Sequence, residues 1–266
     1  TWLVSQVARQ HVTVALSGDG GDELFAGYAW TRMTQLVGQY RARVPEGLRD
    51  IVRNTLNLLP ATPFVARVRR LNEDSYLDPL DVFRRRQTCF DIAQRASLYQ
   101  HDLAIAIAAD ATNRFAQYAR TARQLSTGDA MLYHDFSMYL PDDILTKVDR
   151  MSMAHSLEAR VPLLDYRLVE FAATVPFALK LRGGTTKLLM KHALRSRLPQ
   201  ALLRQRKQGF ALPIQRWFRE GLRRHFEEVV LEPGARSRAF LRPESVRALF
   251  DAHQRGTLHA GHHLWA

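Results

Sequence analysis

Apolar residues recur at two different periods along the chain, and the change falls after Tyr28. The segment His11–Leu16 (His-Val-Thr-Val-Ala-Leu) is apolar and rich in β-branched residues, and glycines follow it. This pattern predicts a short buried strand that enters a tight loop. Residues 31–127 instead have helical spacing, and four prolines interrupt the predicted helices: Pro45, Pro60, Pro63 and Pro79.

Residues 129–266 are predicted to form a succession of helices. In Leu140–Asp143 a proline precedes two carboxylates, which predicts a helix start. Asp165 is expected to cap the next helix, with Leu168 on its buried face. Two further helices are expected to begin at Pro213 and Pro243.

Another helix is expected after the glycine pair at 183 and 184. Lys187 and Lys191 stand four residues apart in it, so they are expected to share one face. One strand cannot form a sheet by itself, so the partner strands of His11–Leu16 are expected upstream of Thr1. The fold class is therefore α/β, with a largely helical C-terminal body.

Composition narrows the function classes. The 266 residues carry a net charge of +12 and are 46% hydrophobic, which is an ordinary globular value. The basic residues are dispersed and not interleaved with aromatic residues, which favours a basic surface or phosphate attraction over nucleic-acid binding. No apolar run approaches the ~20 residues that a membrane span needs.

The chain start and the single cysteine bear on location. The sequence begins at Thr1 without a signal peptide, so we interpret the start as a cut within a longer protein. Cys89, the one cysteine, excludes an internal disulfide framework and is expected to be a small buried side chain. A reducing, cytoplasmic location is the expectation.

The loop Ser17–Glu23 (Ser-Gly-Asp-Gly-Gly-Asp-Glu) carries the strongest chemical signal. Its glycines permit positive φ and close ligand approach, and its amides could form an anion nest. Its three carboxylates would repel a bare phosphate, whereas a Mg²⁺ ion between carboxylates and phosphates would reconcile them. The end of a strand is also where open α/β sheets bind ligands. A structural or calcium-type turn is the alternative, although the spacing is not that of an EF-hand.

Histidines offer a second candidate for metal binding. Three of the ten lie near the C-terminus: His259, His262 and His263. No cysteine or carboxylate cluster accompanies them, so a solvated tail is favoured over a metal site.

The segment Ser17–Tyr28 (SGDGGDELFAGY) resembles the second signature loop of the asparagine-synthetase family. Four later blocks continue the resemblance in the family's order: Tyr139–Met153, Leu157–Asp165, Thr186–Met190 and Arg206–Pro213. The resemblance identifies the chain as the C-terminal part of one asparagine-synthetase domain. It divides into a strand with the signature loop (1–30), a helical segment (31–128) and a helical body with the remaining motifs (129–266).

The resemblance implies a PP-loop-type adenine nucleotide alpha hydrolase-like fold, of which only the later part of the parallel sheet is present. It also implies a carbon–nitrogen ligase that uses ATP and Mg²⁺. Such an enzyme adenylates the side-chain carboxylate of aspartate. Ammonia from a glutaminase domain, which this chain lacks, then gives asparagine, with AMP and pyrophosphate released.

The resemblance also assigns residues of the loop. Ser17 and Gly18 match positions that line the pocket for AMP and the acyl-adenylate. Gly20 and Gly21 are assigned to nucleotide binding with them. The two carboxylates have separate roles: Asp22 matches the Mg²⁺ ligand, and Asp19 matches a carboxylate that handles the ammonia nucleophile or the tetrahedral intermediate. The catalytic cation is Lys187, which matches a lysine that reaches the phosphates.

Residues outside the loop have less certain roles. Glu158 and Arg160 are expected to form an ion pair beside the site, with either a structural or a substrate-binding purpose. Asp149 is a candidate for orienting the substrate. Asp142 and Asp143 are candidates for the same role, and helix capping explains them equally well.

Arg206 and Lys207 either help to hold pyrophosphate or form a solvated basic turn. The family's first phosphate loop, Ser-Gly-Gly-x-Asp-Ser, does not occur in the sequence. The 266 residues alone are therefore expected to be inactive.

The acceptor remains open, because enzymes dedicated to aspartate often carry Glu in place of Asp19 and Ser in place of Gly21. A related amidotransferase or a cyclising synthetase that acts on another carboxylate is the alternative. A non-catalytic basic protein that binds nucleic acid is a third class, and the carboxylate-rich loop argues against it. No nucleic-acid or membrane partner is expected, and the oligomeric state is left open, with a homodimer as one option.

Overall fold

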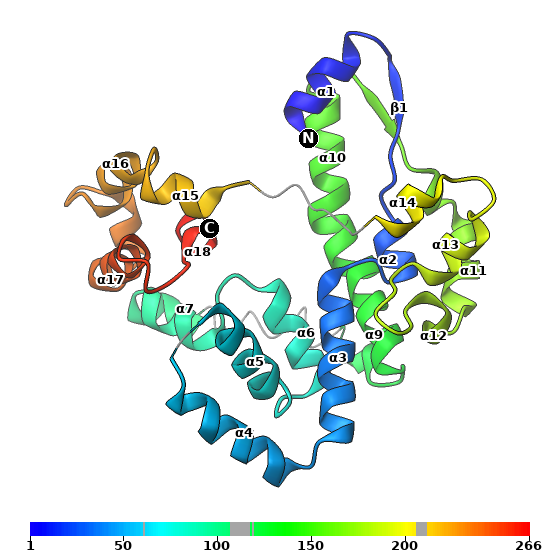
Figure 1. The fold of residues 1–266 in the computed structure, drawn as a ribbon. Helices are drawn as coiled ribbons and strands as arrows, with labels where there is room; N and C mark the ends of the chain where they lie inside the picture. The colour runs from blue at the N-terminus through cyan, green and yellow to red at the C-terminus, as the bar shows by residue number, and fades with distance from the viewer. Residues whose placement is uncertain (61, 107–117, 119, 206–211) are drawn as a thin grey trace. The chain divides into compact units, whose positions relative to one another are not determined.

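The computed structural model describes residues 1–60, 62–106, 118, 120–205 and 212–266. The chain forms two compact units, one from Thr1–Phe83 with Tyr118–Lys207 and the other from Arg84–Gln117 with Gln208–Ala266. Within the described ranges most residues are helical, and the strands form one small parallel sheet (Figure 1). No helix in those ranges is long and apolar enough to cross a membrane.

The sheet of the first unit pairs β1 (Val14–Leu16) with β2 (Glu158–Arg160) in parallel, with Val14 opposite Glu158 and Leu16 opposite Arg160. The predicted strand is confirmed for its last three residues. Two expectations were wrong: β1 has a partner downstream, and it is not buried, since Leu16 is 74% exposed. Side chains of a strand are buried by a layer that packs on a face of the sheet, and among the described residues no such layer covers Leu16, which explains its exposure.

A continuous helical stretch runs from α9 (Thr127–His134) through a π-helical segment, η1 (Asp135–Leu145), into α10 (Thr146–Met153). Pro141 lies inside η1, so the expectation that a helix starts at Leu140–Asp143 was wrong. A proline disrupts the bonding of an α-helix, whereas π-helical segments interrupt that bonding in the middle of a helix. Asp143 does not cap a helix here, and it forms an ion pair with Lys147 at 3.5 Å.

The short helix α2 (Gly21–Phe25) lies at the centre of the first unit. It contacts α9, η1, α11 (Tyr166–Thr174) and α13 (Leu188–Ala193). Leu24 and Phe25 are buried against Ala172 of α11. The predicted cap of α11 is confirmed, because the Asp165 carboxylate accepts a hydrogen bond from the Arg167 amide at 3.0 Å.

Three helices follow the signature loop: α3 (Ala29–Arg43), α4 (Glu46–Leu58) and α5 (Pro63–Asp74). Prolines mark the boundaries as predicted. Pro45 precedes α4, while Pro63 begins α5 and Pro79 begins α6 (Pro79–Gln87). A fixed φ and a missing amide hydrogen suit the first turn of a helix, which explains these positions.

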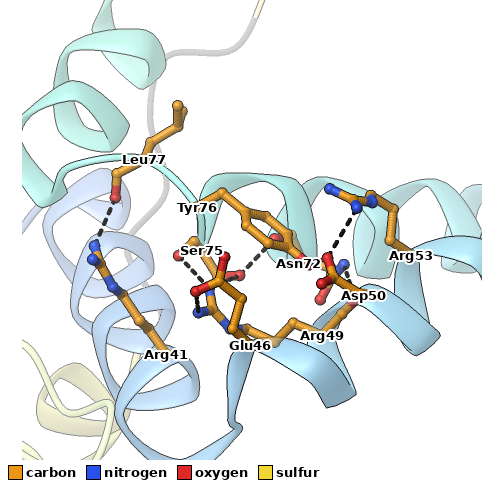
Figure 2. A network of polar contacts seen from close by, with 9 residues as sticks. All are labelled: Arg41, Glu46, Arg49, Asp50, Arg53, Asn72, Ser75, Tyr76 and Leu77. Carbon is orange, nitrogen blue, oxygen red and sulfur yellow. Dashed lines mark hydrogen bonds and ion pairs between the residues drawn. The ribbon is translucent and has the colours of Figure 1, made fainter.

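A polar network joins α4 to the end of α5 (Figure 2). Arg49, 6% exposed, donates to the Ser75 carbonyl at 2.7 Å, and its guanidinium lies over the Tyr76 ring at 4.8 Å. The Tyr76 hydroxyl donates to Asp50 at 2.8 Å, and the Asn72 amide donates to the Arg49 carbonyl at 3.0 Å. The buried arginine therefore satisfies the Ser75 carbonyl where α5 ends, which is a structural role for part of the basic composition.

The second unit has its own apolar core, which includes Phe218, Phe226 and Phe250. The helices predicted at Pro213 and Pro243 are confirmed as α15 (Ile214–Arg219) and α17 (Pro243–Gln254). Its other described elements are α7 (Ile92–Leu98), α16 (Arg223–Phe226), η3 (Glu227–Leu231), η4 (Arg236–Ala239) and α18 (Gly261–Trp265). The first unit also contains α1 (Trp2–Arg9), η2 (Pro162–Leu164), α12 (Phe177–Lys180) and α14 (Gln200–Arg204).

Two expectations for the second unit were wrong. Cys89 is exposed, since it lies beyond the end of α6 and not in a helix. The expectation of a solvated C-terminal tail was wrong in part: His259 and His262 are exposed as expected, but His262 and His263 belong to α18, whose Leu264 is buried, and the centroids of the His263 and Phe90 rings lie 4.9 Å apart.

A substitution at Gly128 of α9 tests the packing of the first unit. A methyl group at this position would overlap the Phe177 ring, so Gly128→Ala should lower the free energy of unfolding by about 1 to 3 kcal/mol. Gly38, inside α3, has open space around it, so Gly38→Ala should stabilise the protein by about 0.5 to 1 kcal/mol. Urea unfolding measures both, and a Gly128→Ala protein as stable as the parent would contradict the packing.

Candidate functional site

The signature loop connects β1 to α2 and is held against η2. Gly20 has φ +85°, and a side chain there would overlap Leu164, so only glycine fits. A Cβ on Gly21 would lie 2.9 Å from the Leu163 Cδ1 atom. Gly20 and Gly21 are buried, whereas Gly18 is exposed and a Cβ there would meet no atom within 4 Å. The face of the loop that is open to a ligand therefore lies around Gly18.

The first carboxylate of the loop is held by a local hydrogen bond. The Ser17 hydroxyl donates to Asp19 at 2.5 Å, and the Ser17 amide donates to the Arg160 carbonyl at 2.8 Å. The backbone of β2 thus fixes the point where the loop begins. Asp19 remains partly accessible beside the open face at Gly18.

The second carboxylate, Asp22, forms an ion pair with Lys187 at 3.0 Å, and the two side chains are 14% and 26% exposed. The Lys187 amide also donates to the Phe25 carbonyl at 3.1 Å. A methyl group on Gly27 would overlap both the Asp22 carboxylate and the Lys187 side chain. The ion pair therefore depends on a glycine at position 27, which the sequence pattern alone did not reveal.

Lys187 is not on a helix face shared with Lys191, so that expectation was wrong. Lys187 is the N-cap of α13 with a left-handed backbone, φ 53°, and the Lys191 amide donates to its carbonyl at 2.8 Å. The Asp22 pair and the Phe25 hydrogen bond hold Lys187 toward α2. Strained backbone of this kind costs about 1 to 3 kcal/mol and collects at functional sites.

An aromatic cluster with acidic neighbours adjoins the loop, and sequence reasoning missed it. The Tyr28 hydroxyl donates to the buried Glu23 carboxylate at 2.5 Å, and the Tyr28 ring stacks on Trp30 at 4.1 Å. Tyr139 meets Tyr28 edge-on at 5.5 Å, and the Trp30 indole donates to Asp135 at 3.2 Å. The only sequence signal was that Asp135 and Tyr139 stand four residues apart, as neighbours on a helix do.

The acidic surroundings perturb both tyrosines. Burial, followed by the nearby Asp143, raises the pKa of Tyr139 to about 12. Burial and the hydrogen bond to Glu23 raise the pKa of Tyr28 well above its ordinary value. Both phenols are therefore neutral hydrogen-bond donors at physiological pH.

The remaining predicted residues lie beside the loop, apart from it, or outside the described residues. Glu158 and Arg160 form the expected ion pair at 2.7 Å on β2, but their side chains are 55% and 63% exposed. The hydrogen bond that Arg160 donates to Glu158 raises the pKa of Arg160. Asp149 is exposed on α10. Arg206 and Lys207 lie outside the described residues.

The loop can contribute one carboxylate to a metal ion that arrives with a ligand. No group of three His, Cys, Asp or Glu side chains suitable for a metal occurs within the part of the chain that the structure describes. Mg²⁺ needs only one or two protein carboxylates when phosphates supply other oxygens. Asp22 fits that need, with Lys187 beside it as a second positive group.

The structure is that of a mostly helical α/β protein, with a glycine-rich, carboxylate-bearing loop at the C-terminal end of a parallel strand, which is where open α/β sheets bind ligands. The whole chain, residues 1–266, matches the family model described as Asparagine synthase, and the chain belongs to that family. This finding confirms the resemblance drawn from the sequence motifs.

Curated relatives of the chain are named as asparagine synthetases. The chain is 31% identical to the Bacillus subtilis protein "Asparagine synthetase [glutamine-hydrolyzing] 1" over 252 residues, which cover 95% of this chain and 38% of that protein. It is 30% identical to a Mycobacterium tuberculosis "Putative asparagine synthetase [glutamine-hydrolyzing]", over 83% of this chain and 33% of the relative. The chain therefore spans well under half the length of these relatives.

A double-mutant cycle tests the Asp22–Lys187 pair. Asp22→Asn, Lys187→Met and the double variant should give a coupling energy of about 1 to 3 kcal/mol in urea unfolding, because the pair is partly desolvated. The pair of Asp143 and Lys147, whose side chains are 49% and 46% exposed, is the control and should couple by less than about 1 kcal/mol. Equal coupling in both pairs would contradict the partial burial.

Alkaline titration tests the environment of Tyr139. The difference in tyrosinate absorbance between the parent and Tyr139→Phe should have its midpoint near pH 12. Asp143→Asn should move that midpoint down, because it removes a nearby negative charge. Since the folded state holds the phenol proton more tightly, this group lowers stability as the pH rises from about 10 toward 12. A midpoint near the ordinary tyrosine value would show that Tyr139 is not in this environment.

Proposed function

We propose that the chain is the synthetase portion of an ATP-dependent, glutamine-hydrolysing asparagine synthetase with a PP-loop-type nucleotide fold. In this proposal the side-chain carboxylate of aspartate is adenylated, pyrophosphate leaves, and glutamine-derived ammonia displaces AMP to give asparagine. The observation that carries it is the Asp22–Lys187 pair, held at 3.0 Å at the end of the signature loop, in a chain that matches the family from end to end.

Lys187 is suited to phosphate because its ammonium is a compact charge held at a fixed place. Asp22 and the Phe25 carbonyl restrain it, so less ordering is needed when an anion binds. Negative charge that develops on the phosphates would be stabilised by this preorganised cation. The role proposed for Lys187 is therefore electrostatic stabilisation.

Asp22 would hold Mg²⁺, and the ion would supply charge neutralisation to the triphosphate when bound. The open face at Ser17 and Gly18 would receive the nucleotide, with Gly20 and Gly21 giving the loop its shape. Asp19 would accept a proton from ammonia or orient it, since the Ser17 hydroxyl fixes this carboxylate. Cytoplasmic location belongs to the same proposal.

A second candidate is a related amidotransferase or cyclising synthetase for another carboxylate. Two observations favour it. The aspartate at position 19 is shorter than a glutamate, and it accepts a hydrogen bond from Ser17. It therefore leaves more room at the loop than a glutamate would. A serine at position 21 would also meet Leu163, since even a Cβ lies 2.9 Å from the Cδ1 atom.

Pyrophosphate release tests the proposal on the natural protein in which these residues occur, supplied with ATP, Mg²⁺, glutamine and aspartate. Asp22→Ala and Lys187→Ala should each lower the rate by about a hundredfold or more, because each removes charge stabilisation. Lys191→Ala is the matched control and should stay near the parental rate.

The outcomes separate the two candidates. Release that depends on aspartate and is lost in both variants supports asparagine synthesis. Pyrophosphate release only with another carboxylate would change the assigned substrate and leave the assigned adenylation chemistry unchanged. The 266 residues alone should release no pyrophosphate, and amide formation by them would contradict the assignment of an incomplete site.

A further inference from the structure

Lys180, the last residue of α12, is a buried lysine that the proposed chemistry does not use. The residue is only 3% exposed. Within the described residues no hydrogen bond or ion pair of its ammonium occurs, and the nearest carboxylate to influence it, Asp129, lies beyond ion-pair distance. The ammonium keeps some contact with solvent while the rest of the side chain is buried, and no contact in the part of the chain that the structure describes accounts for a positive charge at this position.

Lys180 lines a cavity of about 390 Å³ in the first unit. The walls are mostly apolar, with Leu24, Leu132, Phe136 and Val169 among them. Ligand pockets of about this size hold small molecules, and they combine an apolar lining with a few placed polar groups. Desolvation by the lining lowers the pKa of Lys180, in agreement with the burial of its side chain.

Two carboxylates share the cavity wall with the lysine. Asp129 accepts a hydrogen bond from the Ser126 hydroxyl at 2.6 Å, and Glu23 accepts one from Tyr28 at 2.5 Å. Asp129 raises the pKa of Lys180, which places the two charges within electrostatic reach without direct contact. The cavity thus offers a positive and a negative group that do not neutralise one another.

We propose that this cavity binds a small zwitterionic amino acid with an apolar side chain. Its carboxylate pairs with Lys180, its ammonium faces Asp129, and its side chain packs among Leu24, Leu132 and Phe136. A simple carboxylate would leave Asp129 and Glu23 facing an anion, and a simple amine would leave Lys180 facing a cation. Only a ligand with both charges satisfies both walls.

The site is separate from the nucleotide proposal. Neither Asp22 nor Lys187 lines the cavity, so ligand binding there requires no ATP and no acceptor substrate. Glu23 and Leu24 belong to α2, the helix that also carries Asp22, so the cavity borders the back of the signature loop.

Isothermal titration calorimetry without nucleotide, on the natural protein in which these residues occur, tests the proposal, with leucine, 4-methylpentanoate and 3-methylbutylamine as probes. Leucine should bind, and each probe that lacks one charge should bind at least about tenfold more weakly. Lys180→Met and Asp129→Asn should each weaken leucine binding at least about tenfold, whereas Lys191→Met should leave it unchanged. Ala173→Leu, which places a larger side chain in the cavity wall and leaves both charged residues in place, should weaken it as well.

Several results would overturn the proposal. If leucine did not bind, or if Lys180→Met bound leucine as tightly as the parent protein does, the proposed site would be wrong. If 4-methylpentanoate bound as tightly as leucine, Asp129 would not recognise the ammonium and the proposal of a zwitterionic ligand would be wrong. Because Lys180→Met replaces an unpartnered charge on a buried side chain by an apolar side chain of similar length, it should fold and melt at a higher temperature than the parent. A lower melting temperature would show that Lys180 serves the fold, against the proposal.

Discussion

The position of one short helix, Gly21–Phe25, is the constraint on which the first unit depends. Five residues are too few to form a stable helix in isolation, so its neighbours must hold it. Four elements contact it, and glycines at positions 20 and 27 let η2 and the Lys187 side chain approach. The same seating directs Asp22 toward Lys187 and Glu23 toward Tyr28, so the site and the core are fixed by one arrangement.

Two residues with strained backbone conformations flank the contact between α2 and α13. Ala26 and Lys187 both adopt positive φ, 55° and 53°, which costs residues with a Cβ about 1 to 3 kcal/mol each. The hydrogen bond from the Lys187 amide to the Phe25 carbonyl and the Asp22 ion pair lie between them and offset part of that cost. An arrangement that only served the fold could use glycines at both positions. The lysine at one of them adopts this conformation where its ammonium pairs with Asp22, as the role proposed for it requires.

Local chemistry could be predicted from the sequence where one segment determines it. Proline positions located the helix boundaries at Pro45, Pro63 and Pro79, and Asp165 was recognised as a cap because its partner is two residues away. The three-residue strand β2 was missed, since it is exposed and gives no run of apolar residues. Pro141 suggested a helix start because a π-helical segment around a proline leaves no sequence pattern of its own.

The site was predictable only in part, for the same reason. Asp19, Asp22 and the glycines lie within one short loop, so a joint role could be predicted for them from the sequence. The pairing of Asp22 with Lys187 joins residues far apart in the chain, and Gly27 became meaningful only when both side chains were seen against it. Lys180 carries no local signal at all, because its burial results from tertiary packing around α12 and α9.

A helix that depends wholly on its surroundings also transmits changes between them. Asp22, on α2, engages Lys187, while Glu23 and Leu24 line the cavity that contains Lys180. A ligand that orders Leu24 in the cavity wall would therefore also restrict Asp22, which pairs with Lys187. The reason is that one face of a five-residue helix cannot adjust independently of the next. Coupling between two sites is reciprocal, so ordering of Asp22 by a bound anion would favour the same cavity geometry. Both effects follow from the shortness of α2.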